Sequence, residues 1–238
     1  MVRIENLKIG GMRLLQEDAH LKLCVDSILL AAFARPKRGE RVLELGCGNG
    51  VVEVLMAARD PLLTMDGVEI DEAAAKLAKQ NIELNGLGER IAIYNRDLRA
   101  LEGLGEYGLV VSNPPYRKAG SGGVPESLPM RRALFEIDCT VSDVCRAASK
   151  MLKNGGTFAC VYRPERLADL FCAMRDASLE PKRLCYARHT AGHKPSLVLV
   201  EGRKGGASGL VMLETLSLKK RNNEETLRYK QIYEGGRL

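Results

Sequence analysis

Short apolar runs and longer amphipathic stretches alternate along most of the chain, which is typical of an α/β fold. The runs of mainly apolar residues predict strands, and the stretches with helical spacing between them predict helices. The predicted strands are residues 41–45, 64–70, 91–95, 108–112, 157–162, 183–189 and 196–201. The predicted helices are residues 26–33, 51–59, 72–84 and 165–176, together with a helix that Thr140 or Ser142 caps and that ends at Leu152.

The order of these segments predicts the class of fold. The first five strands alternate with helices and should therefore pair in parallel, whereas the last two follow each other closely. We expect a seven-stranded sheet with helices on both faces, preceded by a small hairpin of residues 12–16 and 20–24. Residues 117–129 hold three glycines and two prolines and are expected to form a loop.

The composition excludes several classes of protein. Hydrophobic residues are 45% of the 238 residues and charged residues are 28%, which is usual for a folded protein in water. The most apolar stretch, residues 24–34, contains Asp26 and Ser27 and is too short to span a bilayer. The N-terminus lacks the apolar core of a signal peptide. Seven cysteines without close pairs argue against a disulfide framework or a zinc ribbon. We therefore expect a cytoplasmic protein without a bound metal.

The net charge of +6 comes from the last third of the chain. Residues 1–162 contain 21 basic and 21 acidic side chains, whereas residues 163–238 contain 15 and 9. A basic region favours an anionic partner, although such an excess is often only a solvated surface. The densest basic clusters are Arg203 with Lys204, and Lys219 with Lys220 and Arg221.

A glycine-rich loop, Glu44-Leu45-Gly46-Cys47-Gly48-Asn49-Gly50, follows the first strand of the predicted sheet. Glycines allow a sharp turn and let a ligand lie against the backbone. Glu44 is unfavourable for a pyrophosphate, and Glu69 at the end of the next strand suits the two hydroxyls of a ribose. These features favour a cationic adenosine ligand without phosphate, which is S-adenosylmethionine.

The segments ELGCGNG (44–50) and VEID (68–71) resemble the first two motifs of the class I S-adenosylmethionine-dependent methyltransferases. The resemblance implies a Rossmann-like sheet of seven strands, with the last strand antiparallel and the cofactor across the carboxyl ends of the first few. It implies that Glu69 holds the ribose and that Asp97 faces the adenine amino group. The expected cofactor residues are Glu44, Gly46, Cys47, Gly48, Glu69, Ile70, Asp97, Leu98 and Asn113.

The fourth predicted strand runs directly into Asn113-Pro114-Pro115-Tyr116, where the two prolines make a rigid turn. The turn presents two acceptors, the side-chain oxygen of Asn113 and the carbonyl of Pro114, and Tyr116 adds a flat face. Two acceptors can hold both hydrogens of a planar exocyclic amine and orient its nitrogen toward a methyl group. We predict that these four residues are catalytic. The turn resembles that of methyltransferases that act on adenine N6, guanine N2 or a glutamine amide.

A finer resemblance covers nearly the whole chain. Residues 11–16, 21–24 and 26–31, together with the catalytic turn, residues 131–136 and the pair Ile232-Tyr233, resemble the bacterial tRNA1(Val) (adenine-37 N6)-methyltransferases. This resemblance implies N6-methylation of a tRNA adenine, namely adenine 37 in the anticodon loop of a valine tRNA. Residues 131–136 lack a histidine that relatives often have.

Two other functions stay open on the sequence. The same turn serves enzymes that methylate rRNA, at guanine N2 or adenine N6, or protein glutamine at N5, and a non-catalytic RNA-binding protein could use the same fold. For a tRNA partner we expect contacts from Arg117 and Lys118 beside the turn and from the two basic clusters. We expect three segments: a substrate-covering extension (1–36), a methyltransferase domain (37–205) and a basic C-terminal extension (206–238). The oligomeric state is left open.

Overall fold

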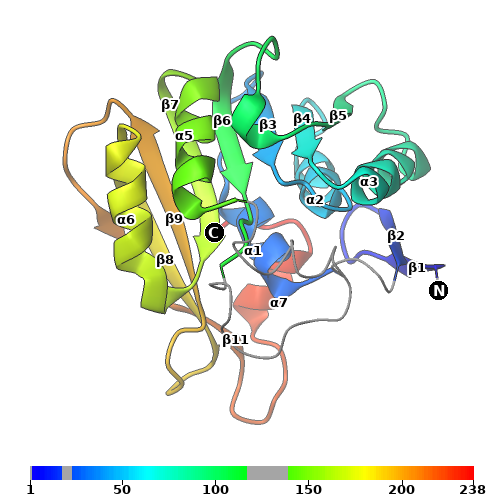
Figure 1. Ribbon diagram of the computed structural model, residues 1–238. Coiled ribbons are helices and arrows are strands. Elements are labelled where there is room, and N and C mark those ends of the chain that lie inside the picture. Colours follow the sequence, from blue (N-terminus) through cyan, green and yellow to red (C-terminus); the bar gives the residue numbers. More distant parts are fainter. Residues whose placement is uncertain (1, 18–22, 117–138) are drawn as a thin grey trace.

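The computed structural model describes residues 2–17, 23–116 and 139–238. Figure 1 shows a large twisted sheet with helices on both faces and a small hairpin beside it. The strands are β1 (Val2–Asn6), β2 (Arg13–Glu17), β3 (Arg41–Leu45), β4 (Thr64–Glu69), β5 (Ile91–Asn95), β6 (Tyr107–Ser112), β7 (Leu152–Tyr162), β8 (Leu179–Thr190), β9 (Leu197–Lys204), β10 (Val211–Met212) and β11 (Leu216–Lys219). The α-helices are α1 (Val25–Phe33), α2 (Val51–Arg59), α3 (Glu72–Leu84), α5 (Val141–Met151), α6 (Leu167–Asp176) and α7 (Leu227–Tyr233).

The large sheet has the strand order β10-β8-β9-β7-β6-β3-β4-β5, and β11 pairs with β8. Strands β3, β4, β5, β6 and β7 pair in parallel, whereas β9 lies antiparallel between β7 and β8. All seven predicted strands are therefore present, and the fold class expected from the sequence is confirmed. The order reverses at β3, which has β4 on one side and β6 on the other. This reversal decides where the site lies.

Each face of the sheet has its own hydrophobic core. Val42 and Leu109 pack in the core that includes residues of α1, α2, α3 and α7, whereas their neighbours Leu43 and Val110 pack in the core that includes residues of α5 and α6. Because successive side chains of a strand point to opposite faces, a strand covered on both sides needs apolar residues at every position. This requirement explains the continuous apolar runs by which the strands were predicted.

The N-terminal hairpin of the structure consists of β1 and β2. β2 pairs antiparallel with β1, a strand that the sequence analysis did not predict, and Leu23 and Cys24, the described residues of the expected partner, lie in no strand. Gly10 and Gly11 both have positive φ, and they let the chain reverse between β1 and β2. Residues 20–22 lie outside the described residues, and Cys24 precedes the first turn of α1. The alternation of apolar and polar residues from position 2 to position 5 was the sequence signal for β1.

Residues 206–238, expected as a C-terminal extension, pack against several parts of the chain. β10 and β11 extend the sheet by pairing in parallel with β8. Tyr229 and Ile232 of α7 are buried in the core shared with α1, and the backbone N–H of Leu238 donates to the carbonyl of Ala32 at 3.0 Å. The division into three segments therefore stays a prediction.

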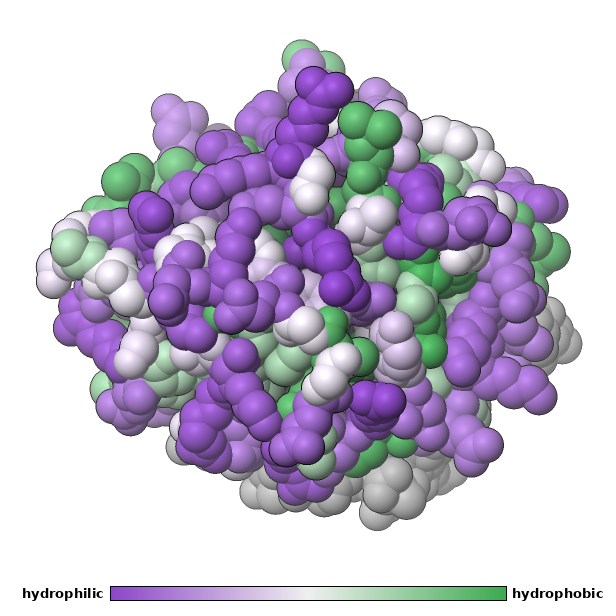
Figure 2. All heavy atoms as spheres, turned by 90° about the horizontal axis from the view of Figure 1, so that it is seen from above, coloured by the Kyte–Doolittle hydropathy of each residue, from purple (hydrophilic) through white to green (hydrophobic). Residues whose placement is uncertain are grey.

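Figure 2 looks onto the edge of the sheet at which the parallel strands begin, and it shows a mainly hydrophilic face with hydrophobic side chains in small patches. None of the helices in the described ranges has the length and apolar character that crossing a lipid bilayer requires. Also within these ranges, no three His, Cys, Asp or Glu side chains are grouped as metal ligands.

Asn81 connects the hairpin to the glycine loop. Its side chain lies in α3 and is fully buried. The Nδ2 group donates to the carbonyls of Leu15, at 3.1 Å, and of Asn49, at 2.8 Å, and Oδ1 accepts from the backbone N–H of Leu15 at 2.6 Å. One amide thus satisfies three backbone groups that would otherwise be buried without partners.

We expect Asn81→Ala to lower the free energy of unfolding by about 2–4 kcal/mol, because it leaves these backbone groups unpaired. Urea denaturation followed by circular dichroism measures this change. Lys79→Ala, at an exposed position of the same helix, is the control and should stay within about 0.5 kcal/mol of wild type. Equal stability of the two variants would contradict the role assigned to Asn81.

Candidate functional site

A cleft opens where β3, β4 and β6 end, on both sides of the point at which the strand order reverses. It encloses about 1260 Å³, including its open mouth. All nine expected cofactor residues line it, and so do Pro114 and Pro115 of the predicted catalytic turn. Tyr116, the last residue of that turn, is not among the lining residues. Polar and thiol side chains to which the sequence analysis gave no role also line the cleft, among them Cys24, Ser27, Asp71, Arg96 and Cys139.

The glycine loop bends under the end of β4. The backbone N–H groups of Gly46 and Cys47 both donate to the carbonyl of Val68, at 2.8 and 3.0 Å. Gly46 and Gly48 have positive φ, and no atom lies within 4 Å of the place where a side chain of either would begin. The loop therefore needs glycine for its backbone conformation and presents bare backbone to the cleft.

Backbone groups hold the carboxylate of Glu69 at the end of β4. Its Oε2 accepts from the N–H of Gly48 and its Oε1 from the N–H of Asp71, each at 2.9 Å. Burial raises the pKa of this carboxyl. Each carboxylate oxygen can accept a further hydrogen bond. The arrangement can therefore bind a pair of neighbouring hydroxyls, as a ribose presents.

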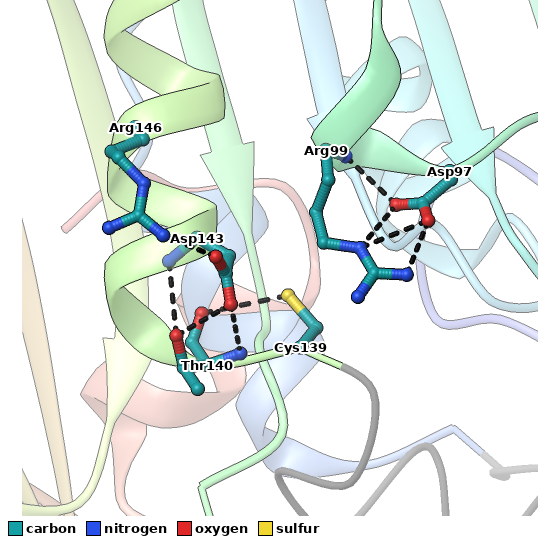
Figure 3. A network of polar contacts seen from close by, with 6 residues as sticks. All are labelled: Asp97, Arg99, Cys139, Thr140, Asp143 and Arg146. Carbon is teal, nitrogen blue, oxygen red and sulfur yellow. Dashed lines mark hydrogen bonds and ion pairs between the residues drawn. The ribbon is translucent and has the colours of Figure 1, made fainter.

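Asp97 lies in the cleft wall next to a cation (Figure 3). Its carboxylate accepts from the backbone N–H of Arg99 at 2.9 Å and from the Arg99 guanidinium at 2.5 and 3.0 Å. These hydrogen bonds lower the pKa of Asp97, so the group is ionised at neutral pH. An amino group bound here would donate to a carboxylate that also accepts hydrogen bonds from Arg99. Figure 3 also shows Cys139, which lies just before Thr140 and likewise lines the cleft.

Asn113 carries a buried acceptor at the end of β6. Its Oδ1 is shielded from solvent and accepts no hydrogen bond from any described residue. The preceding residue, Ser112, donates its hydroxyl to the carbonyl of Leu45 at 2.8 Å and so fixes the end of β6 against β3. A buried polar atom without a partner is costly, and an acceptor kept in this state beside a cleft points to a ligand that donates to it.

Two buried carboxyl groups lie together beneath the glycine loop. Glu44, in β3, lines the cleft, and Glu53 lies in the first turn of α2, where sequence reasoning missed it. Burial and the neighbouring charge of Glu53 raise the pKa of Glu44 well above its usual value, and burial raises the pKa of Glu53 to about 7. The charge of each carboxyl opposes ionisation of the other, so the pair is not fully ionised at neutral pH. Burial likewise raises the pKa of the Cys47 thiol, as suits a space-filling residue.

The residues predicted to contact nucleic acid fall into three groups. Arg117 and Lys118 lie outside the described residues. β11 runs parallel to β8, so Lys219, Lys220 and Arg221 lie at its end on the same edge of the sheet as the cleft. β9 runs in the opposite direction, so Arg203 and Lys204 lie at the far edge. There they donate to the carbonyls of Gly155 and Leu152.

The Glu44–Glu53 pair should make the stability of the chain depend on pH. A carboxyl with a raised pKa in the folded state holds more protons there than in the unfolded chain, so stability falls as pH rises from about 5 to 8. Glu53→Gln removes this penalty and should be more stable than wild type by up to about 3 kcal/mol at pH 8, with little difference near pH 5. Urea denaturation at both pH values measures this. Glu83→Gln, on the exposed face of α3, is the control, and equal pH profiles of wild type and Glu53→Gln would contradict the assignment.

Comparisons with known proteins agree on one family. The model of the methyltransferase small domain matches residues 22–171. Curated proteins from Yersinia pseudotuberculosis and Yersinia pestis, both named tRNA1(Val) (adenine(37)-N6)-methyltransferase, are 33% identical over 157 residues. These matches cover 65% of this chain and 61% and 62% of the relatives, so the chain spans less than two thirds of their length.

Solved structures show the same fold. A predicted O-methyltransferase from Agrobacterium tumefaciens superposes with a TM-score of 0.73 at 21% identity, over 90% of this chain and 98% of its own. A methyltransferase from Pyrococcus furiosus gives a TM-score of 0.53 at 21% identity, over 75% and 81% of the two chains. With the fold confirmed and the family model matching well over half of its residues, the chain belongs to the methyltransferase small domain family, which supports the S-adenosylmethionine cofactor expected from the sequence.

Proposed function

We propose that the chain transfers a methyl group from S-adenosylmethionine to N6 of an adenine in tRNA. The observation that carries the proposal is the buried Oδ1 of Asn113, which has no hydrogen-bond partner among the described residues and belongs to a residue that lines the cleft at the end of β6. The names of the Yersinia relatives support tRNA as the substrate and adenine 37 of a valine tRNA as the target. A tRNA substrate also suits the cytoplasmic location expected from the sequence.

The cleft suits the methyl donor in charge and in shape. The Glu69 carboxylate would hold the ribose hydroxyls, and Asp97 with Leu98 would lie along the adenine. Glu44 lines the cleft at the start of the glycine loop, and a positively charged group bound there would favour the ionised form of the Glu44–Glu53 pair, whereas an anion would oppose it. When bound, S-adenosylmethionine supplies an electrophilic methyl group. The residues of the chain have to hold the acceptor nitrogen in line with it.

The catalytic turn would supply that alignment. The Asn113 Oδ1 and the Pro114 carbonyl would accept the two hydrogens of the target amine and turn its lone pair toward the methyl group. The amine becomes cationic during transfer, and acceptors already in place stabilise the positive charge as it forms. Cys24 and Ser27 line the cleft, which supports the proposal that the N-terminal segment covers the site.

We expect Asn113→Ala to lower the rate of methyl transfer to tRNA about 100-fold to 1000-fold, because one of the two preorganised acceptors is lost. Affinity for S-adenosylmethionine should change much less. Mass spectrometry of nucleosides from tRNA incubated with labelled cofactor measures transfer, and calorimetry measures binding. Glu69→Ala is the matched variant, and it should weaken cofactor binding instead.

Full turnover by Asn113→Ala would contradict the proposed mechanism. Methyl transfer by the wild-type chain only to rRNA, or only to a protein glutamine, would replace the tRNA substrate with one of the alternatives. Cofactor binding without transfer to any of the three would favour the non-catalytic RNA-binding protein.

The basic end of β11 is the part of the predicted RNA surface that lies on the same edge as the cleft. Neutralised phosphates release counterions, so RNA affinity should fall steeply with salt while cofactor affinity changes little. Replacing Lys219, Lys220 and Arg221 together with alanine should make this salt dependence shallower by about two to three in logarithmic slope. Filter binding between 50 and 200 mM salt, a range chosen for a steep response, measures it.

Arg203→Ala combined with Lys204→Ala is the matched control, since these residues lie at the far edge. It should leave the slope unchanged. If this control makes the dependence shallower and the β11 variant does not, the RNA lies on the other edge of the sheet.

A further inference from the structure

Tyr116, the last residue of the catalytic turn, has contacts on one face of its ring and at its hydroxyl. The guanidinium carbon of Arg163 lies 4.2 Å from the centre of the ring. The hydroxyl donates to Oδ2 of Asp26 at 3.5 Å. The backbone carbonyl of Tyr116 also accepts from the guanidinium of Arg166 at 3.2 Å. The residue is therefore fixed at three points by side chains distant from it in sequence.

Arg163 reaches the ring because of the sheet topology. It directly follows β7, which pairs in parallel with β6, so both strands end at the same edge. Its Nη1 donates to the carbonyl of Ser196, just before β9, at 2.9 Å. This hydrogen bond anchors the guanidinium at the β8–β9 connection. A guanidinium placed over an aromatic ring is attracted by the electron-rich face of the ring.

Asp26 comes from the other end of the chain. It lies in the first turn of α1, next to the cleft-lining Ser27 and close to Cys24. Burial raises the pKa of Asp26, and the nearby charge of Arg163 opposes that rise. The two groups carry opposite charges and both contact Tyr116, Asp26 at its hydroxyl and Arg163 at its ring.

We propose that Arg163 and Asp26 are positioning residues that hold the Tyr116 ring in the orientation in which it contacts the target adenine. This inference rests on the proposed function and deepens it. A tyrosine after two prolines can still turn about its side-chain bonds, and each wrong rotamer removes the stacking surface from the amine-binding acceptors. Contacts at the ring and at the hydroxyl remove that freedom before the substrate binds.

A second role for Arg163 would be a contact with an RNA phosphate. The two roles differ in what they change. A phosphate contact contributes to affinity and to its salt dependence, with a change in logarithmic slope of about one per contact. A positioning residue acts on the transfer step at saturating RNA, because it changes geometry in the bound complex.

The test compares Arg163→Ala, Arg163→Lys and Asp26→Asn with wild type in methyl transfer to tRNA at saturating cofactor. We expect Arg163→Ala to lower kcat about 10-fold to 100-fold, with cofactor affinity and the salt slope of RNA binding unchanged. Arg163→Lys keeps the positive charge without the planar guanidinium, and its kcat should lie between those of wild type and Arg163→Ala. Arg175→Ala, whose guanidinium pairs with Glu180 on the surface, is the control and should keep wild-type kcat.

A double-mutant cycle tests the contact of Asp26 with the ring. Asp26→Asn should lower kcat in the wild-type background and have little effect in Tyr116→Phe, because the hydroxyl that it contacts is gone. Melting curves show whether each variant is folded at the assay temperature, and Arg163→Lys keeps the test open should Arg163→Ala unfold.

The outcomes separate this inference from the proposed function. An unchanged kcat in Arg163→Ala, or a higher KM with a shallower salt slope, would overturn the positioning role while tRNA methylation stands. If wild type methylates rRNA or protein instead of tRNA, the proposed substrate is wrong, and the same variants judge the positioning role by kcat on that substrate. If wild type transfers no methyl group to any of them, both are wrong.

Discussion

The parallel pairing of β3 with both β4 and β6 is the constraint on which the site depends. α2, which follows β3, packs on one face of the sheet, whereas α5, the next described helix after β6, packs on the other face, and a cleft lies at the carboxyl ends of these strands. Glu69 ends β4 and Asn113 follows β6, so the two strands that flank β3 bring to one cleft two groups that are 44 positions apart in the sequence. At the opposite end Asp66 of β4 accepts from Arg41 of β3 and from the hydroxyl of Tyr107 of β6, at 2.5 and 2.6 Å. The three strands are thus held in register below the cleft.

Buried polar groups support the cleft more than surface ion pairs do. Asn81 satisfies backbone groups of the hairpin and the glycine loop, and Glu69 satisfies those of Gly48 and Asp71. Such bonds are worth more inside the protein than exposed pairs because water does not compete for them. Glu44 with Glu53, and Asn113, are the exceptions, since burial leaves them poorly compensated. Groups of this kind are retained at sites where a ligand completes their interactions.

The sequence predicted the parts of the fold and the site that depend on local patterns. The strands show as apolar runs, and Glu69 and Asn113 follow from their places directly at strand ends. The pairing of β2 with β1 was missed because it depends on the turn at Gly10 and Gly11, which lies outside the alternating pattern of either strand. Glu53, Asp26 and Arg163 were missed because their importance comes from long-range contacts. A carboxyl in the otherwise apolar start of α2 was still a visible signal, since such a helix is buried.

The basic last third of the chain shows how topology divides a charge that the sequence presents as one region. The two clusters lie within about twenty residues of each other along the chain, but β9 runs against its neighbours while β11 runs with β8. One reversal of direction therefore sends Arg203 and Lys204 to the edge far from the cleft and leaves Lys219, Lys220 and Arg221 on the edge that holds it. Phosphate contacts fix the position of a bound nucleic acid, and for a base that enters the cleft we expect them from the cluster on that side. Counting charges along the sequence therefore gives too large a basic surface near the cleft. The direction of each strand shows which basic residues lie on that side.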